Sequence, residues 1–222
     1  MSLKPLKKSD LGKDWLTKRR DSKKSIYPEY HLIVTEGIKT EQNYFNAMKE
    51  IINQNYKDRI QIKVSGEGDN TVNLFEIAKN YAEKDPNGYK HIWVVYDTDD
   101  FPKENIDEVL RLCNKNSNSN RQYHAIWSNQ CVELWYLLHF SFMQSDLHRR
   151  EYFPKLDDCL QKIGAGKYEK NRKDMYDVLK PYMDDAIRNA KALKKLNKNK
   201  LPSESSPGTM IFELVEKIKP YL

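Results

Sequence analysis

The amino-terminal half of the chain alternates short apolar segments with stretches of helical periodicity, and this alternation limits the folds open to it. The apolar segments are EYHLIVTEG (29–37), RIQIKVSGEG (59–68), HIWVVYDTDD (91–100) and QYHAIWSN (122–129). Each has the pattern of a β-strand, and the run from His91 is apolar on both faces, as in a strand covered by helices on both sides. A β-α-β-α-β-α-β order predicts an α/β fold with a mostly parallel sheet flanked by helices and joined by right-handed crossovers.

Four helices are expected between and after these strands: 39–53, 70–85, 103–115 and the short apolar stretch CVELWYLLHF at 131–140. Thr40 is the expected cap of the first helix, and Asn70 or Thr71 of the second. From Ser141 onward no strand is convincing. Helices are predicted at 152–164, 174–195 and 208–222, and NKNKLPSESSPG (197–208) is predicted to be a mobile polar linker.

The positive charge is unevenly distributed along the chain, which has a net charge of +6. Residues 1–24 hold nine Lys or Arg against three Asp, and residues 186–200 carry only basic charges. Both segments could bind phosphates or simply keep the protein in solution. The predicted organisation is a basic flexible N-terminal arm (1–26), an α/β core (27–140) and a helical C-terminal region (141–222).

Two further expectations concern the compartment and the cysteines. The chain has no apolar run of membrane-spanning length and no apolar segment like that of a signal peptide, so the cytoplasm is the expected compartment. Cys113, Cys131 and Cys159 are widely spaced, which predicts neither a disulfide framework nor a thiolate zinc site.

Acidic residues stand where two of the predicted strands end. Glu36 follows the first strand, and Asp97, Asp99 and Asp100 close the third. Ligands of parallel sheets gather at the carboxyl ends of the strands, so these acids converge if the first strand lies beside the third. Converging carboxylates repel one another without a cation, and Mg²⁺ or Mn²⁺ would suit such oxygen ligands. Turn-forming or helix-capping acids remain the alternative reading.

Several stretches of the chain together resemble the RloB family. They are TEGIKTEQNYF, SGEGDNTVNLFEIAK, VVYDTDD and WSNQCVELWYLLHF, in order over about residues 32–140, and GTMIFELVEKI near the end. The Glu-Gly after the first strand and the Asp-x-Asp after a later one also resemble a Toprim domain, a metal-binding module of topoisomerases, primases and nucleases. Two positions depart from the usual family pattern: Gln130 replaces a Pro and Val132 replaces a Phe.

The resemblance implies a Toprim-like core in a bacterial protein of restriction and phage-defence gene clusters, acting beside an ATPase partner in abortive infection. It also implies a metal-dependent nuclease that cuts RNA or DNA, with tRNA as one plausible substrate. By the Toprim scheme, Glu36 would be an acid-base group or a ligand, Asp97 and Asp99 would hold Mg²⁺, and Asp100 would be an extra ligand. The alternative is a non-catalytic regulatory or binding subunit that docks on the ATPase.

A phosphatase of the haloacid dehalogenase type also uses an Asp-x-Asp pair, but there the pair follows the first strand. This chain has Thr35-Glu36-Gly37 at that position, which argues against that class. Two residues that follow could also take part. Lys39 would bind a substrate phosphate or be a solvated lysine, and Glu41 would be a first-turn glutamate stabilised by the helix dipole.

Glu133 is the one acid within the apolar stretch that follows the fourth strand. A carboxylate there must be paired or must face the site, so it could complete the metal shell or accept a hydrogen bond from Ser128 or Asn129. His139 is expected to be a core or partly exposed histidine. Cys131 is not expected to act as a nucleophile, because the sequence places no histidine to activate it.

Overall fold

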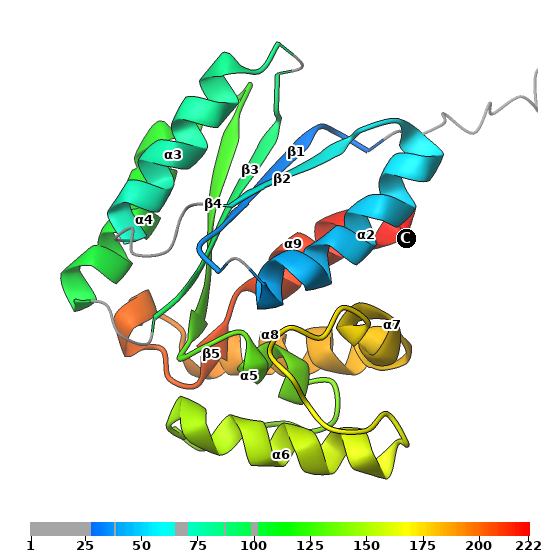
Figure 1. Cartoon of the computed structure of the whole chain (residues 1–222). Helices are drawn as coiled ribbons and strands as arrows, with labels where there is room; N and C mark the ends of the chain where they lie inside the picture. Colours follow the sequence, from blue (N-terminus) through cyan, green and yellow to red (C-terminus); the bar gives the residue numbers. More distant parts are fainter. Residues whose placement is uncertain (1–27, 38, 65–70, 87, 99–101) are drawn as a thin grey trace, which may run out of the picture.

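A five-stranded sheet in the order β2-β1-β3-β4-β5 forms the centre of the computed structural model, which describes residues 28–37, 39–64, 71–86, 88–98 and 102–222 (Figure 1). The strands are β1 (His31–Thr35), β2 (Ile60–Val64), β3 (His91–Asp97), β4 (Gln122–Asn129) and β5 (Gly208–Thr209). The first four are mutually parallel, and β5 runs antiparallel to the end of β4. The predicted α/β fold, with a mostly parallel sheet flanked by helices, is confirmed.

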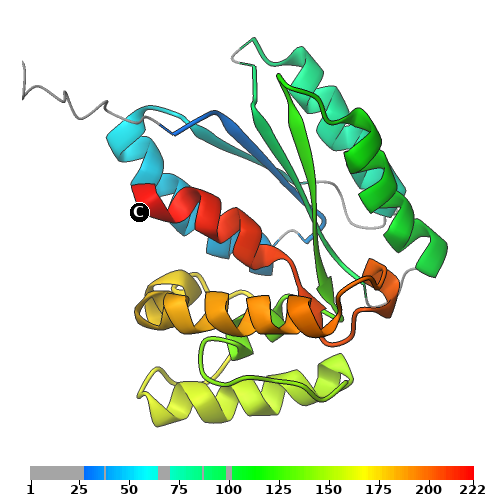
Figure 2. The same ribbon diagram turned by 180° about the vertical axis from the view of Figure 1, so that it is seen from behind.

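Helices cover both faces of the sheet, as the apolar run of β3 predicted. One face carries α3 (Thr71–Lys84) and α4 (Lys103–Asn116), and the other carries α2 (Thr40–Tyr56) and α9 (Ile211–Ile218) (Figures 1 and 2). Alternate residues of β3 enter opposite cores: Trp93 packs on the side of α2 and Val94 on the side of α3. Odd-numbered positions of β3, including Asp97, therefore face the layer of α2 and α9.

Beyond the carboxyl ends of the strands lies a second group of helices (Figure 1). These are α5 (Glu133–Leu137), α6 (Arg149–Lys162), α7 (Met175–Leu179) and α8 (Met183–Leu196). The long helix predicted over 174–195 is divided between α7 and α8 by a 3₁₀ turn at Lys180–Tyr182, where Pro181 lacks the N–H that a continuous helix needs.

Two expectations for the C-terminal region were wrong. The chain returns to the sheet as β5, a strand of two residues that is too short to show an alternating pattern in sequence. The segment predicted to be a mobile linker is also held in place, by a 3₁₀ turn at Pro202–Glu204 (η3). There Ser203 donates from its N–H and its Oγ to the Asp107 carboxylate on α4, at 3.0 and 2.8 Å.

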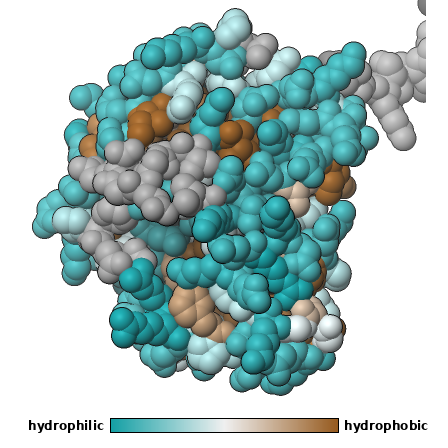
Figure 3. Space-filling view, in the orientation of Figure 1, coloured by the Kyte–Doolittle hydropathy of each residue, from teal (hydrophilic) through white to brown (hydrophobic). Residues whose placement is uncertain are grey.

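Smaller expectations were also tested. Thr40 does not cap α2: it is the first helical residue, and its Oγ1 donates to the backbone oxygen of Lys170 at 2.8 Å. Thr71 begins α3, whereas Asn70 lies outside the described residues, as does the predicted basic arm. All three cysteines are free. Within the described ranges no helix is long and apolar enough to cross a membrane, and the face seen in Figure 3 is mainly hydrophilic.

Candidate functional site

Glu36 and Asp97 lie together at the carboxyl ends of two neighbouring strands. Strands β1 and β3 pair in parallel, with Thr35 opposite Val95, and the Glu36 N–H donates to the Val95 carbonyl at 3.1 Å. The Glu36 carboxylate in turn accepts a hydrogen bond from the Asp97 backbone N–H. Asp99 and Asp100, the other two predicted ligands, lie outside the described residues.

Two more acids join this pair from helices. Glu41 comes from the first turn of α2 and is 7% exposed, and Glu133 begins α5 and is 2% exposed. The charges of Glu41, Glu133 and Glu36 all act on Asp97. We call these four residues, Glu36, Glu41, Asp97 and Glu133, the carboxylate cluster. Glu41 is in the first turn as predicted, but its place in the cluster was not foreseen.

Gly37 explains how Glu41 reaches the cluster. A Cβ atom at position 37 would lie only 2.1 Å from Oε2 of Glu41, far inside van der Waals contact. The absence of a side chain therefore lets the Glu41 carboxylate lie directly against the backbone that follows Glu36. The Glu-Gly pair and the glutamate at position 41, which the sequence presents as one motif, are parts of a single packing arrangement.

Burial and mutual repulsion oppose ionisation of the carboxyl groups in the cluster. Burial raises the pKa of Glu36 to about 7, helped by the charge of Glu41 and opposed by the Asp97 N–H. Burial and the neighbouring glutamates raise the pKa of Asp97 well above its ordinary value. Within the described structure, Oε2 of Glu36 is buried and has no hydrogen-bond partner. Such a group must take up a proton or meet a cation to be stable in its buried position.

The loop between α6 and α7 brings two further polar side chains to the cluster. It is attached to α2 by two hydrogen bonds, from Thr40 to Lys170 and from Asn43 Nδ2 to the Asn171 oxygen at 3.1 Å. The Tyr168 hydroxyl donates to Oε1 of Glu133 at 2.7 Å. The charge of Lys170 lowers the pKa of Asp97 and of Glu41, against the larger effect of burial.

Two of the residues singled out from sequence, Ser128 and Asn129, have structural partners away from the carboxylate cluster. Ser128 Oγ and Thr209 Oγ1 are 2.9 Å apart, and Asn129 Nδ2 donates to the Pro202 oxygen at 3.3 Å. Both therefore hold the returning C-terminal segment, and the hydrogen bond predicted from one of them to Glu133 was wrong: its partner is Tyr168. Lys39 is exposed at the start of α2.

The remaining two expectations concern His139 and Cys131. His139 is a core histidine, whose Nδ1 lies 2.9 Å from the Trp135 oxygen and whose pKa burial lowers to about 4. Burial, together with the charges of Glu133 and Asp97, raises the pKa of the Cys131 thiol. A thiol held in its protonated form is a poor nucleophile.

The carboxylate cluster suits a divalent cation in kind, although the described part does not supply a whole site. Its donors are carboxylate oxygens, the ligands that Mg²⁺ and Mn²⁺ prefer, and one of them is buried without a hydrogen bond from the described residues. Across the described ranges, no group of three or more His, Cys, Asp or Glu side chains is arranged to hold a metal ion. The set predicted from sequence includes Asp99, which lies outside those ranges.

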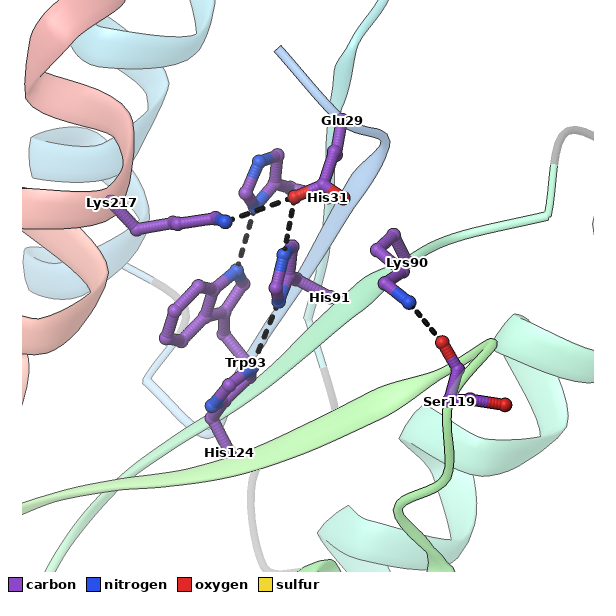
Figure 4. A network of polar contacts seen from close by, with 8 residues as sticks. All are labelled: Glu29, His31, Lys90, His91, Trp93, Ser119, His124 and Lys217. Atoms are coloured by element: carbon purple, nitrogen blue, oxygen red, sulfur yellow. Dashed lines mark hydrogen bonds and ion pairs between the residues drawn. The ribbon is translucent and has the colours of Figure 1, made fainter.

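A second cluster of titratable residues, with His31 and His91 buried at its centre, lies at the opposite ends of the same strands (Figure 4). His91 is central: its Nε2 lies 2.8 Å from Oε2 of Glu29, and its Nδ1 lies 3.0 Å from Nε2 of His124. Trp93 stacks on His124 with ring centres 4.0 Å apart and donates from Nε1 to Nδ1 of His31 at 3.0 Å. We call the whole group the histidine cluster: Glu29, His31, His91, Trp93, His124 and Lys217.

Comparison with protein families gives a match over most of the chain. Residues 31–218 match the family described as RloB-like protein, which covers the sheet, the carboxylate cluster and the C-terminal helices. Neither the curated proteins nor the solved structures compared with the chain gave a significant match. Because the matched region is most of its length, the chain belongs to the RloB-like family.

Proposed function

We propose that this RloB-like chain is a divalent-cation-dependent nuclease with a Toprim-type site, which hydrolyses or transfers phosphodiester bonds of RNA or DNA. The single observation that supports this most is the pairing of Glu36 with Asp97 at the ends of neighbouring strands, with one buried Glu36 oxygen left without a hydrogen bond in the described structure. The proposed setting is the bacterial cytoplasm, in antiviral defence by abortive infection beside an ATPase partner.

Several residues in and beside the carboxylate cluster have proposed roles. Asp97, with Asp99 and Asp100, would hold Mg²⁺ or Mn²⁺, which when bound would activate a water or hydroxyl and screen the phosphodiester charge. Glu36 would accept or donate the proton, or bind the cation, and its pKa of about 7 suits acid-base work near neutral pH. Lys170 would meet a substrate phosphate, and Tyr168 would orient Glu133 through its 2.7 Å hydrogen bond.

The test is incubation of the purified full chain with mixed RNA, tRNA and DNA substrates, with and without Mg²⁺ or Mn²⁺. We expect cation-dependent cleavage that Glu36→Gln and Asp97→Asn both remove. Matched controls are Glu50→Gln and Asp158→Asn, which change exposed acids outside the cluster and should leave cleavage intact. Cation-independent cleavage, or cleavage that survives both cluster substitutions, would contradict the proposal. Nucleic-acid binding without any cleavage would favour the non-catalytic subunit.

A further inference from the structure

A cavity of about 620 Å³ lies along the open edge of β4, outside the carboxylate cluster. Its walls come from α4, β4, the end of α8 and the segment that leads from η3 through β5 into α9, and none of its lining residues belongs to the carboxylate cluster. Figure 2 shows α8, in orange, reaching β5 at the carboxyl end of β4. The volume lies within the roughly 300–1,000 Å³ typical of small-molecule pockets.

The hydrogen bonds of β4 show which backbone groups face this cavity. The Gln122 N–H donates to the Lys90 oxygen at 2.8 Å, and the Ser128 oxygen accepts from the Thr98 N–H at 3.1 Å. Even-numbered residues of β4 thus turn their backbone groups toward β3. Since alternate residues of a strand bond to opposite sides, odd-numbered residues in 123–127 turn theirs toward the cavity.

Two of these three outward-facing residues are already partly bonded. Tyr123 donates its N–H to Ser117 Oγ at 2.9 Å, and the Trp127 oxygen accepts from the Met210 N–H at 2.9 Å. Between them lies Ala125, which lines the cavity and which no described strand pairs with on this side, because β5 meets β4 only at 128 and 129. The N–H and C=O of Ala125 therefore form a short stretch of strand edge, which we call the window. The bonded residues Tyr123 and Trp127 bound it at both ends, and it is too short to pair with an added strand.

Flat apolar surface flanks the window. The rings of Tyr123 and Trp127 line the cavity and keep 6% and 8% of their surface exposed, and Leu110 and Met210 add aliphatic contacts. An aromatic ring that also offers hydrogen-bonding edges would suit such a place, because it could contact the apolar wall and bond to the backbone together.

The lining of the cavity is also strongly basic. Five lysines line the cavity against one acid, Glu213: Lys191, Lys194, Lys195, Lys198 and Lys200. The first two are neutralised, Lys191 by Glu216 and Lys194 by Glu213, each at 2.6 Å. The other three are exposed and form no ion pair with any residue that the structure describes. An anionic ligand group would neutralise the charges of these three lysines and accept hydrogen bonds from them.

We infer that this cavity binds a free nucleoside phosphate. Its base would lie on the window at Ala125 beside Trp127, and its phosphates would meet Lys195, Lys198 and Lys200. The bounded window and the lysines that line the same cavity favour this ligand over an acidic peptide strand. The inference is independent of the proposed nuclease activity, because the two sites share no residue.

The test is calorimetric titration of the full chain, in EDTA so that the carboxylate cluster holds no cation, with ATP, GTP, adenosine and inorganic triphosphate. We expect a nucleoside triphosphate to bind more tightly than either adenosine or triphosphate. Lys195→Glu with Lys198→Glu should weaken binding at least about ten-fold. Asn114→Trp, which puts a large ring at an exposed lining position of α4, should weaken it as well.

The matched control is Lys155→Glu with Lys162→Glu on α6, which makes the same charge change away from the cavity and should leave affinity unchanged. Glu36→Gln should also bind normally, which separates this site from the proposed nuclease. The inference is overturned if neither nucleotide binds, or if the α6 control weakens binding as much as the cavity variant. It is also overturned if triphosphate binds as tightly as ATP, or if only single-stranded oligonucleotides bind.

Discussion

The two ends of the central strands hold buried titratable clusters of opposite character. At the amino ends, burial lowers the pKa of His31 to about 3 and of His124 to about 4, so the rings are neutral at neutral pH. At the carboxyl ends, burial raises the pKa of Glu36 to about 7 and that of Asp97 well above its usual range. The histidine cluster reaches a stable state by losing protons, whereas the carboxylate cluster needs protons or a cation.

Each cluster contains one buried atom without a hydrogen-bond partner among the described residues. The two atoms differ in the charge of the group to which they belong. Trp93 donates to Nδ1 of His31, so the neutral ring carries its proton on Nε2, the unpartnered atom. At Glu36 the unpartnered atom is a carboxylate oxygen. An unpaired neutral N–H costs about 1–3 kcal/mol, whereas an unpaired carboxylate costs far more. We therefore infer a structural role for one end and a chemical role for the other.

The largest expected effect is on activity at the carboxylate end. Asp97→Ala should lower cleavage at least about 100-fold, because loss of a proposed ligand should cost no less than the roughly 10–100-fold that follows loss of a partner behind a ligand. Because it removes one of several like charges, the cation-free variant should melt no lower than the cation-free wild type. Cleavage assays and thermal melts in EDTA measure both quantities. A large fall in melting temperature would instead identify Asp97 as a structural residue.

The second effect is on stability at the histidine end. Trp93→Phe keeps most of the buried ring but removes the N–H that bonds His31, which should lower the free energy of unfolding by about 1–3 kcal/mol. Cleavage per folded molecule should stay unchanged. Tyr81→Phe, at a ring that is 41% exposed, serves as the control and should change neither quantity. If Trp93→Phe loses cleavage but keeps its fold, the histidine end does not have a purely structural role.

Much of this contrast was accessible from sequence. The apolar run ending in Asp97 and the Glu-Gly after the first strand placed Glu36 and Asp97 at one carboxyl edge of the sheet, because parallel strands share that edge. That the two acids lie side by side required β1 to neighbour β3, which the structure shows. The histidine cluster was missed although it left a signal. His31 and His91 each open an apolar strand, and His124 is near the start of a third, so in a parallel sheet they lie at one edge.

Other parts of the fold and of the candidate site could not be predicted from the sequence, for physical reasons. Tyr168 and Lys170 lie in a loop without periodicity, and the contact of that loop with α2 joins segments about 130 residues apart in sequence. Glu41 was placed correctly on its helix, but its burial depends on the close approach that Gly37 permits. Strand β5 has only two residues, and its pairing with β4 depends on how the preceding polar segment packs on α4.

The third prediction uses pH at the carboxylate end. A carboxyl group whose folded pKa is raised stabilises the fold fully below its unfolded value, 4.5 for Glu36, and loses that contribution as pH rises through about 7. Glu36→Gln removes this dependence, so the cation-free variant should gain about 1–2 kcal/mol relative to wild type between pH 5 and 8, allowing for partial exposure. Glu50→Gln is the control. If the free energies of unfolding of Glu36→Gln and of wild type change in parallel with pH, the pKa of Glu36 is not raised in the folded protein.

The smallest expected effect is at the histidine end. Lys217 lies 2.9 Å from Oε2 of Glu29, and both side chains are nearly half exposed, so the pair contributes only about 0.2–1 kcal/mol at neutral pH. Its hydrogen bond is the largest cause that lowers the pKa of Glu29, to about 2, and its charge also helps to lower that of His31 and His124.

Lys217→Met should therefore change how the free energy of unfolding falls as the pH is lowered from 7 to 4. Histidines with lowered pKa stabilise the fold above 6.5 and lose that contribution as pH falls toward about 3 to 4. Removing Lys217 raises these values and that of Glu29, so the variant should lose less stability than wild type between pH 7 and 4. The control is Lys219→Met, whose lysine is equally exposed and pairs with Asp184 instead. If both variants reduce the loss of stability between pH 7 and 4 by the same amount, the change in net charge causes the effect and the histidine cluster does not.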